Sequence, residues 1–391
     1  MTPLRLAGLI LVLCLGTFAV TTTGSSMAPF LTSMSGDLNA DLAAIANLFS
    51  VQALSWGVSS LIAGSISDRI GRRPVLVVAL LILVASRVGL YAAQTYSAAL
   101  LWNLLSGVGG GAFMGAVFAA VADNVPTGTR GRALGWVMTG QSLSLVLGVP
   151  LVTLLGAFGG WRGATLAHGT ALMIAAIGVW LVVPRDPQRH AATSQLPMLP
   201  MRELRAARVG LLLAASTMER ACFASLTIYL ATYLQQSYAV EFSRLALALL
   251  LVALGNLVGN LVGGQLADRL RNRPLTFGIS LGSAALLALP LLLWRPGLWV
   301  SVLLGCAYSF LTAIGRPSLL TALSDVPAQV RGAVLGINVT MSSLGWLLAA
   351  GVGGVLVARL GFGSLGLFCA LAGLIGSSFA VAHRRTPAHA Q

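Results

Sequence analysis

Twelve stretches of about 20 apolar residues run along this chain, and they constrain its fold more than any other feature. A helix of that length crosses the hydrocarbon of a bilayer, where no water can satisfy exposed backbone groups. Only 9% of the 391 residues are charged and 57% are hydrophobic, more apolar surface than soluble cores could bury. We therefore predict an all-α membrane protein with twelve transmembrane helices rather than a water-soluble globule. The expected spans are residues 6–31, 43–66, 74–94, 98–122, 133–157, 163–183, 208–234, 244–266, 274–294, 298–323, 333–357 and 362–382.

The first stretch has one feature of a secretory signal peptide. Residues 21–26 are small and polar, as a cleavage region is. The apolar stretch continues through Met27, Pro29 and Leu31, beyond the length of a signal core, and its removal would leave eleven spans. We expect a retained helix.

Arginine placement predicts the orientation in the membrane. All 24 basic residues are arginine, and basic residues accumulate in cytoplasmic loops. With a cytoplasmic N-terminus, seventeen arginines lie on the cytoplasmic side, four on the opposite side and three within spans. We therefore expect both termini in the cytoplasm. This topology also accounts for the net charge of +14, which is then no reason to expect nucleic acid.

A repeat with an offset of about 200 residues predicts two related halves. Residues 64–74 (GSISDRIGRRP) recur at 264–274 (GQLADRLRNRP), and a second match at an offset of 201 relates 125–135 to 326–336. Each half holds six spans, an even number, so the halves would be two six-helix bundles related by a pseudo-two-fold axis along the membrane normal. The expected division is a bundle over 1–183, a proline- and arginine-rich cytoplasmic linker over 184–207, and a bundle over 208–391.

The loop between spans two and three has the pattern G-x-x-x-D-R-x-G-R-R, which resembles the signature loop of the major facilitator superfamily. The resemblance covers essentially the whole chain. It implies a secondary transporter in which spans one, four, seven and ten line a central cavity, and a loop that latches the two halves in the outward-facing state. Positive-inside anchoring is the alternative for the arginines. The implied gating residues are Gly64, Asp68, Arg69, Gly71, Arg72 and Arg73, with Asp268 and Arg269 of the second copy, in which Arg271 replaces the glycine.

Span five contains Gly148 and Pro150, followed by Gly-Gly-Trp-Arg. The segment resembles a variant of the antiporter motif found in drug and sugar efflux members of the superfamily, although the stricter motif places glycine directly before proline. Glycine permits close helix contact and proline removes one backbone donor, so we expect this helix to bend or to pack tightly. Ordinary glycine-rich packing is the alternative.

Ionisable groups at membrane depth are functional candidates. Glu219 in span seven is the one carboxylate inside a predicted span, and Arg220 and Arg316 lie on spans seven and ten. Our interpretation is that Glu219 binds the coupling proton and that Arg220 or Arg316 supplies the counter-charge. A static salt bridge between helices is the alternative. Arg87 in span three is expected to anchor in the outer headgroups by snorkelling.

Substrate contacts are harder to assign. The family often has an arginine in span four, four residues before a glycine-rich run, and here that position is Asn103. Because the span-four arginine is absent, Arg220 and Arg316 become stronger candidates for the counter-charge. Few charges and several aromatic rings suit a moderately hydrophobic, neutral or weakly charged molecule. The candidate cavity residues are Asn103, Phe113, Tyr229, Tyr233 and Phe310.

The leading hypothesis is proton-coupled efflux of small organic compounds, such as drugs or metabolites, across a bacterial cytoplasmic (inner) membrane. The lack of lysine favours a GC-rich bacterial source. A proton-coupled uptake symporter and a transporter-like sensor are the alternatives. A membrane enzyme would need a cluster of nucleophile, base or metal ligands, and the spans carry one carboxylate and no paired histidines.

We expect neither a metal nor a cofactor, because the four cysteines and four histidines lack ligand spacing. ATP is not expected as the energy source, since a P-loop needs the lysine that this chain lacks. The expected partners are a small-molecule substrate, protons and the lipid bilayer, with no nucleic acid, and the expected working form is a monomer.

Overall fold

The computed structural model describes residues 3–125, 127–184, 209–270, 272–326 and 328–385. These residues form helices and their connections, with no strand among them. They fall into two compact units, which we describe one at a time. Unit 1 comprises the described residues of Met1–Leu196 and Glu241–Leu247, and unit 2 those of Pro197–Val240 and Ala248–Gln391.

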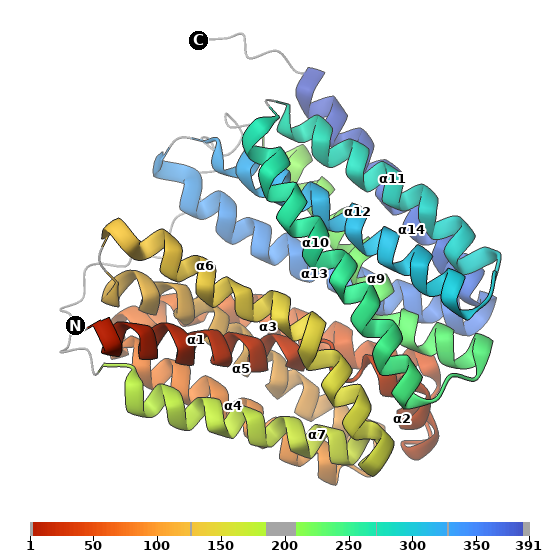
Figure 1. The fold of residues 1–391 in the computed structure, drawn as a ribbon. Coiled ribbons are helices and arrows are strands. Elements are labelled where there is room, and N and C mark those ends of the chain that lie inside the picture. The colour runs from red at the N-terminus through yellow and green to blue at the C-terminus, as the bar shows by residue number, and fades with distance from the viewer. Residues whose placement is uncertain (1–2, 126, 185–208, 271, 327, 386–391) are drawn as a thin grey trace. The chain divides into compact units, whose positions relative to one another are not determined.

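Unit 1 is built from seven α-helices and two short turns of other helix types (Figure 1). In chain order they are α1 (Pro3–Thr23), the 3₁₀ turn η1 (Ala28–Phe30), α2 (Leu31–Asp37), α3 (Leu42–Ile70), α4 (Arg72–Ala92), α5 (Tyr96–Asn124), α6 (Thr127–Leu143), the π-helical turn η2 (Ser144–Gly148) and α7 (Val149–Val182). Unit 2 contains six α-helices, of which α10 begins with residues that belong to unit 1. These are α9 (Gly210–Tyr238), α10 (Phe242–Arg269), α11 (Arg273–Leu293), α12 (Leu298–Ser324), α13 (Ala328–Leu360) and α14 (Phe362–Arg385).

Among the described residues, 11 helical stretches are long and apolar enough to cross a membrane. One of them, Ala133–Val182, is 50 residues long. At 1.5 Å per residue it would measure roughly 75 Å, more than twice the hydrocarbon thickness. The backbone breaks within it at Gly160, where φ is 61° and ψ is −170°, and Figure 1 shows the chain reversing its direction there. This stretch is therefore long enough for two crossings.

The first expected span, 6–31, is not one continuous helix. Helix α1 ends at Thr23, and the chain then passes through a turn and η1 before α2 begins. Gly24, Ser25 and Ser26 follow the last helical residue, and all three favour turns over helix. Pro29 then removes a backbone donor, which a continuing helix would need. The polar segment that resembled a cleavage region is the break between two helices.

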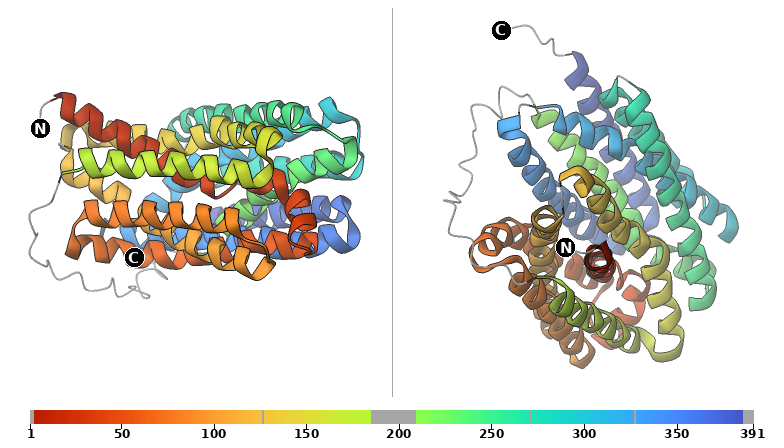
Figure 2. Two further views of the ribbon diagram at one scale, coloured as in Figure 1. Left: turned by 90° about the horizontal axis from the view of Figure 1, so that it is seen from below. Right: turned by 60° about the vertical axis from the view of Figure 1, so that its left-hand side comes forward.

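Glycines bring two pairs of helices into backbone contact. In unit 1, Gly107, Gly111 and Gly115 of α5 face carbonyl oxygens of α3, beside which α5 runs in Figures 1 and 2. In unit 2, Gly255, Gly259 and Gly263 of α10 face carbonyl oxygens of α12 in the same way. A Cβ added at any of these six positions would lie closer than 3.0 Å to the facing oxygen. We call these contacts the glycine seams of the two units.

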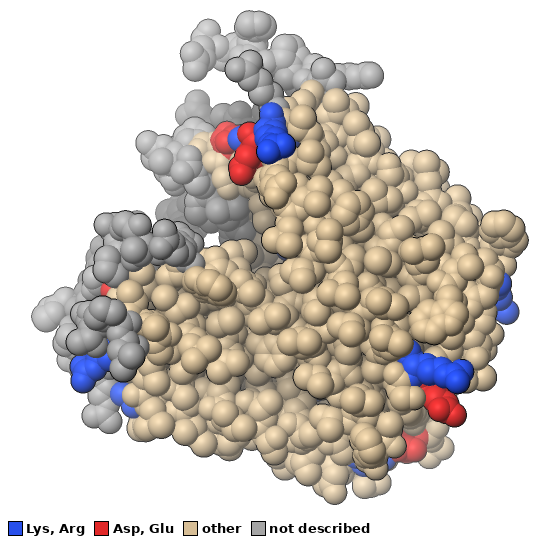
Figure 3. Space-filling model, in the orientation of Figure 1, with Lys and Arg blue, Asp and Glu red and all other residues tan. Residues whose placement is uncertain are grey.

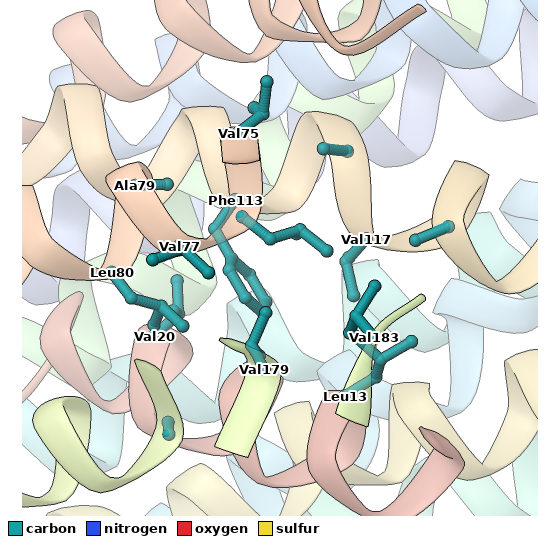
Figure 4. Close-up of a cluster of buried hydrophobic side chains, with 14 of the residues drawn as sticks. Leu13, Val20, Val75, Val77, Ala79, Leu80, Phe113, Val117, Val179 and Val183 are labelled. Atoms are coloured by element: carbon teal, nitrogen blue, oxygen red, sulfur yellow. The ribbon is translucent and has the colours of Figure 1, made fainter. Parts of the chain in front are cut away.

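Apolar side chains fill the interior of unit 1. Leu13 of α1, Leu80 of α4, Phe113 of α5 and Val179 of α7 are fully buried and belong to one cluster (Figure 4). Lipid tails are as apolar as these side chains, so the close fit itself, more than transfer out of lipid, holds the helices together. Phe113 also packs against Gly16, where an added Cβ would lie 2.7 Å from its ring.

The outward faces of the helices are apolar as well. Ile174 and Leu181 of α7 are 68% and 73% exposed, and Leu371 of α14 is 63% exposed. Figure 3 shows a broad uncharged face with charged side chains gathered at its margins. Exposed apolar surface on this scale is the surface that a bilayer covers.

Candidate functional site

The midsection of unit 2 holds a carboxylate between two guanidinium groups. Glu219 of α9 has no exposed surface. Arg220 Nε donates to Glu219 Oε2 at 2.6 Å, and Arg220 Nη2 contacts Oε1, so the pair is bidentate. Arg316 of α12 contributes a longer contact, with 3.4 Å from its Nη1 to Glu219 Oε2. The three groups together carry one excess positive charge when Glu219 is ionised.

The neighbouring helix α13 makes room for this bidentate pair. Consecutive residues point about 100° apart on a helix, so Arg220 must curl back along α9 to meet Glu219. Gly345 of α13 lies against this bend, because a Cβ there would sit 2.5 Å from Arg220 Cβ and 2.6 Å from the carbonyl oxygen of Thr217. A larger residue at Gly345 would push Arg220 away from its partner.

An aromatic pair flanks the charged cluster. The guanidinium carbon of Arg220 lies 4.4 Å from the ring centre of Phe223, a cation–π distance. Phe223 in turn meets Trp346 of α13 edge to face, with ring centres 6.3 Å apart. Both rings are partly exposed. The site therefore combines positive charge with an apolar wall.

Polar contacts tie the helices around Glu219 to α9. Ser216 Oγ donates to Asn338 Oδ1 of α13 at 2.6 Å. Tyr308 of α12 donates its hydroxyl to the carbonyl of Cys222 at 3.0 Å, and Cys222 Sγ lies 3.4 Å from the carbonyl of Cys369 on α14. Each contact lies within about one helical turn of Glu219 on α9. Three helices are thereby fixed around the carboxylate.

The charged cluster lies well inside its helices. Glu219 is nine residues from the start of α9, or roughly 13 Å at 1.5 Å per residue. Arg316 is eight residues from the end of α12, or roughly 12 Å. Charged groups at such a depth face protein or water, because exposure to lipid is too costly. The side chain of Arg316 is nevertheless 30% exposed.

Unit 1 buries a different polar cluster, which contradicts the prediction that Arg87 snorkels to the headgroups. Arg87 of α4 has no exposed surface and donates from Nη2 to Ser106 Oγ of α5 at 2.7 Å. Gln52 of α3 donates to the same hydroxyl at 3.1 Å. Gly169 of α7 leaves space for the arginine stem, since a Cβ there would lie 3.2 Å from Arg87 Cβ. The guanidinium thus turns inward, and no described carboxylate pairs with it.

The signature loop forms a compact network at the end of α3. Gly71 adopts a φ of 96°, a conformation that side-chain-bearing residues resist, which agrees with the expected turn. Arg72 pairs with Asp68 and with Asp123 of α5, the latter at 2.9 Å from its Nε. Arg73 lies over the ring of Trp180 at 4.4 Å. All these contacts are internal to unit 1, and the latch between halves stays a prediction.

The second copy of the loop repeats part of this network. Arg273 pairs with Asp325, the residue that follows α12, and its Nε donates to the carbonyl of Ala267 at 3.3 Å. Gly64 of the first copy lies near α5, because an added Cβ would sit 3.7 Å from the carbonyl oxygen of Gly115. Arg271 lies outside the described residues. The side chains of Arg69, Asp268 and Arg269 are exposed.

The segment around Gly148 and Pro150 is closely packed. A Cβ at Gly148 would clash with the side chain of Thr22 on α1, and Pro150 is buried in the first turn of α7. Directly before Pro150 the helix takes a π-helical turn.

Beyond Gly160, the residues Trp161 and Arg162 meet two other connections of unit 1. Trp161 Nε1 donates to Asp37 Oδ2 at 2.9 Å, and Arg162 pairs with the same carboxylate. Arg162 Nη2 also donates to the carbonyl of Ala93, at 3.2 Å, where α4 ends. The Gly-Gly-Trp-Arg sequence thus joins the ends of α2, α4 and the returning half of α7.

The structure buries four of the five expected substrate residues inside their own units. The Asn103 side chain donates to the carbonyl of Ala99 at 2.9 Å, and Phe113 lies in the core of unit 1. Tyr229 and Tyr233 donate their hydroxyls to carbonyl oxygens at 2.8 and 2.9 Å. Phe310 is partly exposed. As substrate contacts, all five stay predictions.

Sequence reasoning did not identify several neighbours of Glu219. Phe223 is four residues beyond Glu219 and shares its helix face, so helical spacing could have found it. Gly345, Trp346 and Asn338 lie more than a hundred residues away in the chain. No local pattern links them to Glu219, and only the packing of α13 against α9 brings them there.

Apolar helices of membrane length, glycine seams and a charged cluster enclosed at helical depth together define a polytopic helical membrane protein. Comparison with known proteins gives the family. A sequence profile described as Major Facilitator Superfamily matches residues 13–350 and 240–391. The chain therefore belongs to the major facilitator superfamily of membrane transporters.

Individual relatives are distant but match along most of their length. The chain is 25% identical over 379 residues to the uncharacterized MFS-type transporter YwfA of Bacillus subtilis, covering 96% of this chain and 90% of the relative. It is 26% identical over 357 residues to the inner membrane transport protein YdhP of Escherichia coli, covering 90% of each.

The fold also resembles a solved structure of a bacterial homolog to the human lysosomal transporter Spinster. The TM-score is 0.73 with 15% sequence identity, and the match covers 98% of this chain and 96% of the other. At this identity the likeness concerns the fold alone.

Proposed function

We propose that this chain is a proton-coupled secondary transporter of small organic compounds and that Glu219 binds the coupling proton. One observation carries the proposal. Glu219 has no exposed surface, and two guanidinium groups contact it there. In the proposed cycle, Glu219 either contacts the two guanidinium groups or carries a proton. Because Glu219 is on α9 and Arg316 is on α12, protonation would change the contact between these two helices. Such a link is what secondary transport by alternating access requires.

The proposed topology has twelve crossings, with Ala133–Val182 crossing twice around Gly160. It places both termini in the cytoplasm, a six-helix half on each side of the linker over 184–207, and a monomer as the working form. The arginine distribution and the sequence repeat support this arrangement. The inner membrane is the proposed location. The name of the Escherichia coli relative, an inner membrane transport protein, supports this proposal.

Two directions of transport are open to such a protein. Efflux in exchange for protons is supported by the resemblance of Gly148 and Pro150 to an antiporter motif, and by the close packing of Gly148 against Thr22 of α1. Uptake together with protons is supported by the charges of unit 2. Two guanidinium groups around one carboxyl leave a doubly positive site when the carboxyl is protonated.

The test is transport by purified protein in liposomes that enclose a pH-sensitive dye, screened over a library of small organic compounds. We expect some compounds to accumulate only when a pH gradient is imposed, and we expect Glu219→Gln to abolish this dependence. Glu241→Gln removes an exposed carboxylate and serves as the matched control. Gradient-driven transport that persists unchanged in Glu219→Gln would disprove the assignment of Glu219.

A further inference from the structure

We propose that the cargo is an organic oxyanion, such as a carboxylate, that binds to Arg316 and takes up a proton at Glu219 as it binds. This inference rests on the proposed function and concerns the same site. It departs from the neutral or weakly charged cargo that the sequence alone suggested.

The two arginines of the site are not equivalent. Arg220 holds Glu219 through two hydrogen bonds, stacks on Phe223 and is only 10% exposed. Arg316 makes a single contact to Glu219, at 3.4 Å, and its side chain is 30% exposed. Glu219 is the one described residue to which Arg316 donates. A guanidinium has five N–H groups, so Arg316 keeps most of its donors for another acceptor.

The exposed part of Arg316 belongs to a residue whose Cα lies roughly 12 Å inside its helix. A guanidinium is too costly to leave among acyl chains, so we infer that this exposed part faces water. A molecule that reaches it from the water meets a planar fork of donors. Carboxylates and other oxyanions match this fork with two parallel hydrogen bonds, whereas amines are repelled.

Within the described part of the chain, the groups shown in contact around Glu219 include no second acid to offset this charge. On α9 its charged or titratable neighbours are Arg220 and Cys222, on α12 they are Arg316 and Tyr308, and on α14 it is Cys369. Helix α13 contributes the neutral side chains of Asn338 and Trp346. Among these described residues, the net charge is +1 with Glu219 ionised and +2 with Glu219 protonated. Both states favour an anion over a cation.

Charge also determines how cargo and proton influence each other. A proton on Glu219 removes the negative partner of Arg316, which then binds an anion more tightly. By thermodynamic reciprocity, an anion on Arg316 favours protonation of Glu219 by the same factor. Anion and proton therefore bind together, and this coupling corresponds to the uptake direction of the two proposed above. A cationic cargo would instead displace the proton.

The partly exposed rings of Phe223 and Trp346 indicate that the rest of the cargo is apolar. Phe223 of α9 lies against Arg220, and Trp346 of α13 meets Phe223 edge to face, so the pair extends an apolar surface from the positive charge. An oxyanion with an attached aromatic or aliphatic body satisfies both features. A small inorganic anion would leave the rings uncovered.

The test measures binding to the purified full-length protein with a library of matched triplets, in which one scaffold carries a carboxylate, an amide or an amine. We expect the bound compounds to be carboxylates, and we expect Arg316→Gln to weaken them by at least about tenfold, the loss of one charge-assisted hydrogen bond. Titration calorimetry in two buffers of different ionisation enthalpy reports proton uptake. We expect up to about one proton per bound carboxylate in the wild type and none in Glu219→Gln.

Several results would overturn this inference. They are a preference for amines, proton release on binding, undiminished carboxylate affinity in Arg316→Gln, or no carboxylate bound at millimolar concentration. Transport of amines in exchange for protons would overturn it while leaving the proposed function intact. No gradient-driven transport of any compound would instead disprove the proposed function.

Anionic lipid is the other source of an oxyanion. A phosphate headgroup could contact Arg316 in the same way, so binding is compared in nanodiscs of phosphatidylcholine alone and of phosphatidylcholine with phosphatidylglycerol. Cargo binding predicts the same carboxylate affinity in the lipid without net charge. The inference would be overturned if Arg316→Gln weakened carboxylate binding in phosphatidylcholine alone but not in the presence of phosphatidylglycerol. That result would assign Arg316 to the lipid headgroup.

Discussion

Each unit has a glycine seam, between α3 and α5 in unit 1 and between α10 and α12 in unit 2. The two seams differ in which helix of the pair carries the glycines. In unit 1 the glycines are on α5, and in unit 2 they are on α10. Shifted by the repeat offset of 201, Gly107, Gly111 and Gly115 of α5 become Tyr308, Thr312 and Arg316 of α12. Moving the glycines to α10 leaves α12 free to carry large side chains. Two of these, Tyr308 and Arg316, lie at the charged site.

The two units also bury arginine differently. Arg87 in unit 1 bonds to a serine hydroxyl, whereas Arg220 in unit 2 bonds to a carboxylate. Close backbone packing is thus common to both units, while the buried charges differ. The proposed proton site at Glu219 therefore belongs to unit 2, where a buried arginine has a carboxylate partner.

The largest expected effect is on the buried arginines. Arg220→Met leaves Glu219 buried with only the 3.4 Å contact from Arg316, and should lower the free energy of unfolding by about 3–5 kcal/mol. Arg87→Met removes a buried charge that has no described carboxylate partner, and the loss of its hydrogen bond to Ser106 should cost at most about 1 kcal/mol. Thermal unfolding in detergent measures both. Equal losses of unfolding free energy in the two variants would contradict this difference between the units. The Glu219→Gln/Arg220→Met double variant should recover part of the stability that Arg220→Met loses.

The next effect concerns the seams. Gly111→Leu and Gly259→Leu force a side chain against a backbone carbonyl, and each should cost about 1–3 kcal/mol of stability by overpacking. Gly264→Leu is the control on α10, because an added Cβ there meets nothing within 4 Å. The yield of folded protein and its thermal unfolding report the outcome. If the Gly264 and Gly259 variants behaved alike, the seam of unit 2 would not be a close contact.

The smallest expected effect is at the two signature loops. Arg72 is 11% exposed and contacts two carboxylates, whereas Arg273 is 29% exposed and contacts one, Asp325, which is 58% exposed. Arg72→Gln should cost about 1 kcal/mol, and Arg273→Gln less, because exposed ion pairs contribute little. High salt should reduce both losses, more so for Arg273. A larger loss in Arg273→Gln would reverse the ranking of the two loops.

The sequence predicted most of the helices and the family. Long apolar stretches specify membrane helices because the bilayer tolerates few alternatives, and the boundaries of α3, α4, α5 and α9 to α14 lie within about five residues of expectation. The break after Thr23 was missed, because hydropathy averages over short polar turns. The two spans expected within Ala133–Val182, 133–157 and 163–183, lie on either side of the break at Gly160.

The candidate site was predictable only in part. Glu219, Arg220 and Arg316 were singled out because charge is rare at membrane depth, and the structure brings them together. The direction of a side chain is a different matter. Arg87 was expected to point outward from its place near the end of a helix, but the neighbouring Ser106 and Gly169 that draw it inward come from other helices. Contacts of that kind leave no trace in local sequence.

The π-helical turn at Ser144–Gly148 alters the phase of the helix in which it sits. Such a turn accommodates one extra residue, so the side chains beyond it are rotated by about 100° relative to an uninterrupted α-helix. Gly140 precedes the turn and Gly148 is its last residue, and both face α1, one at Cys14 and the other at Thr22. Deleting one residue from the turn would rotate Gly148 away from Thr22 of α1, while the contact of Gly140 with Cys14 would stay in place.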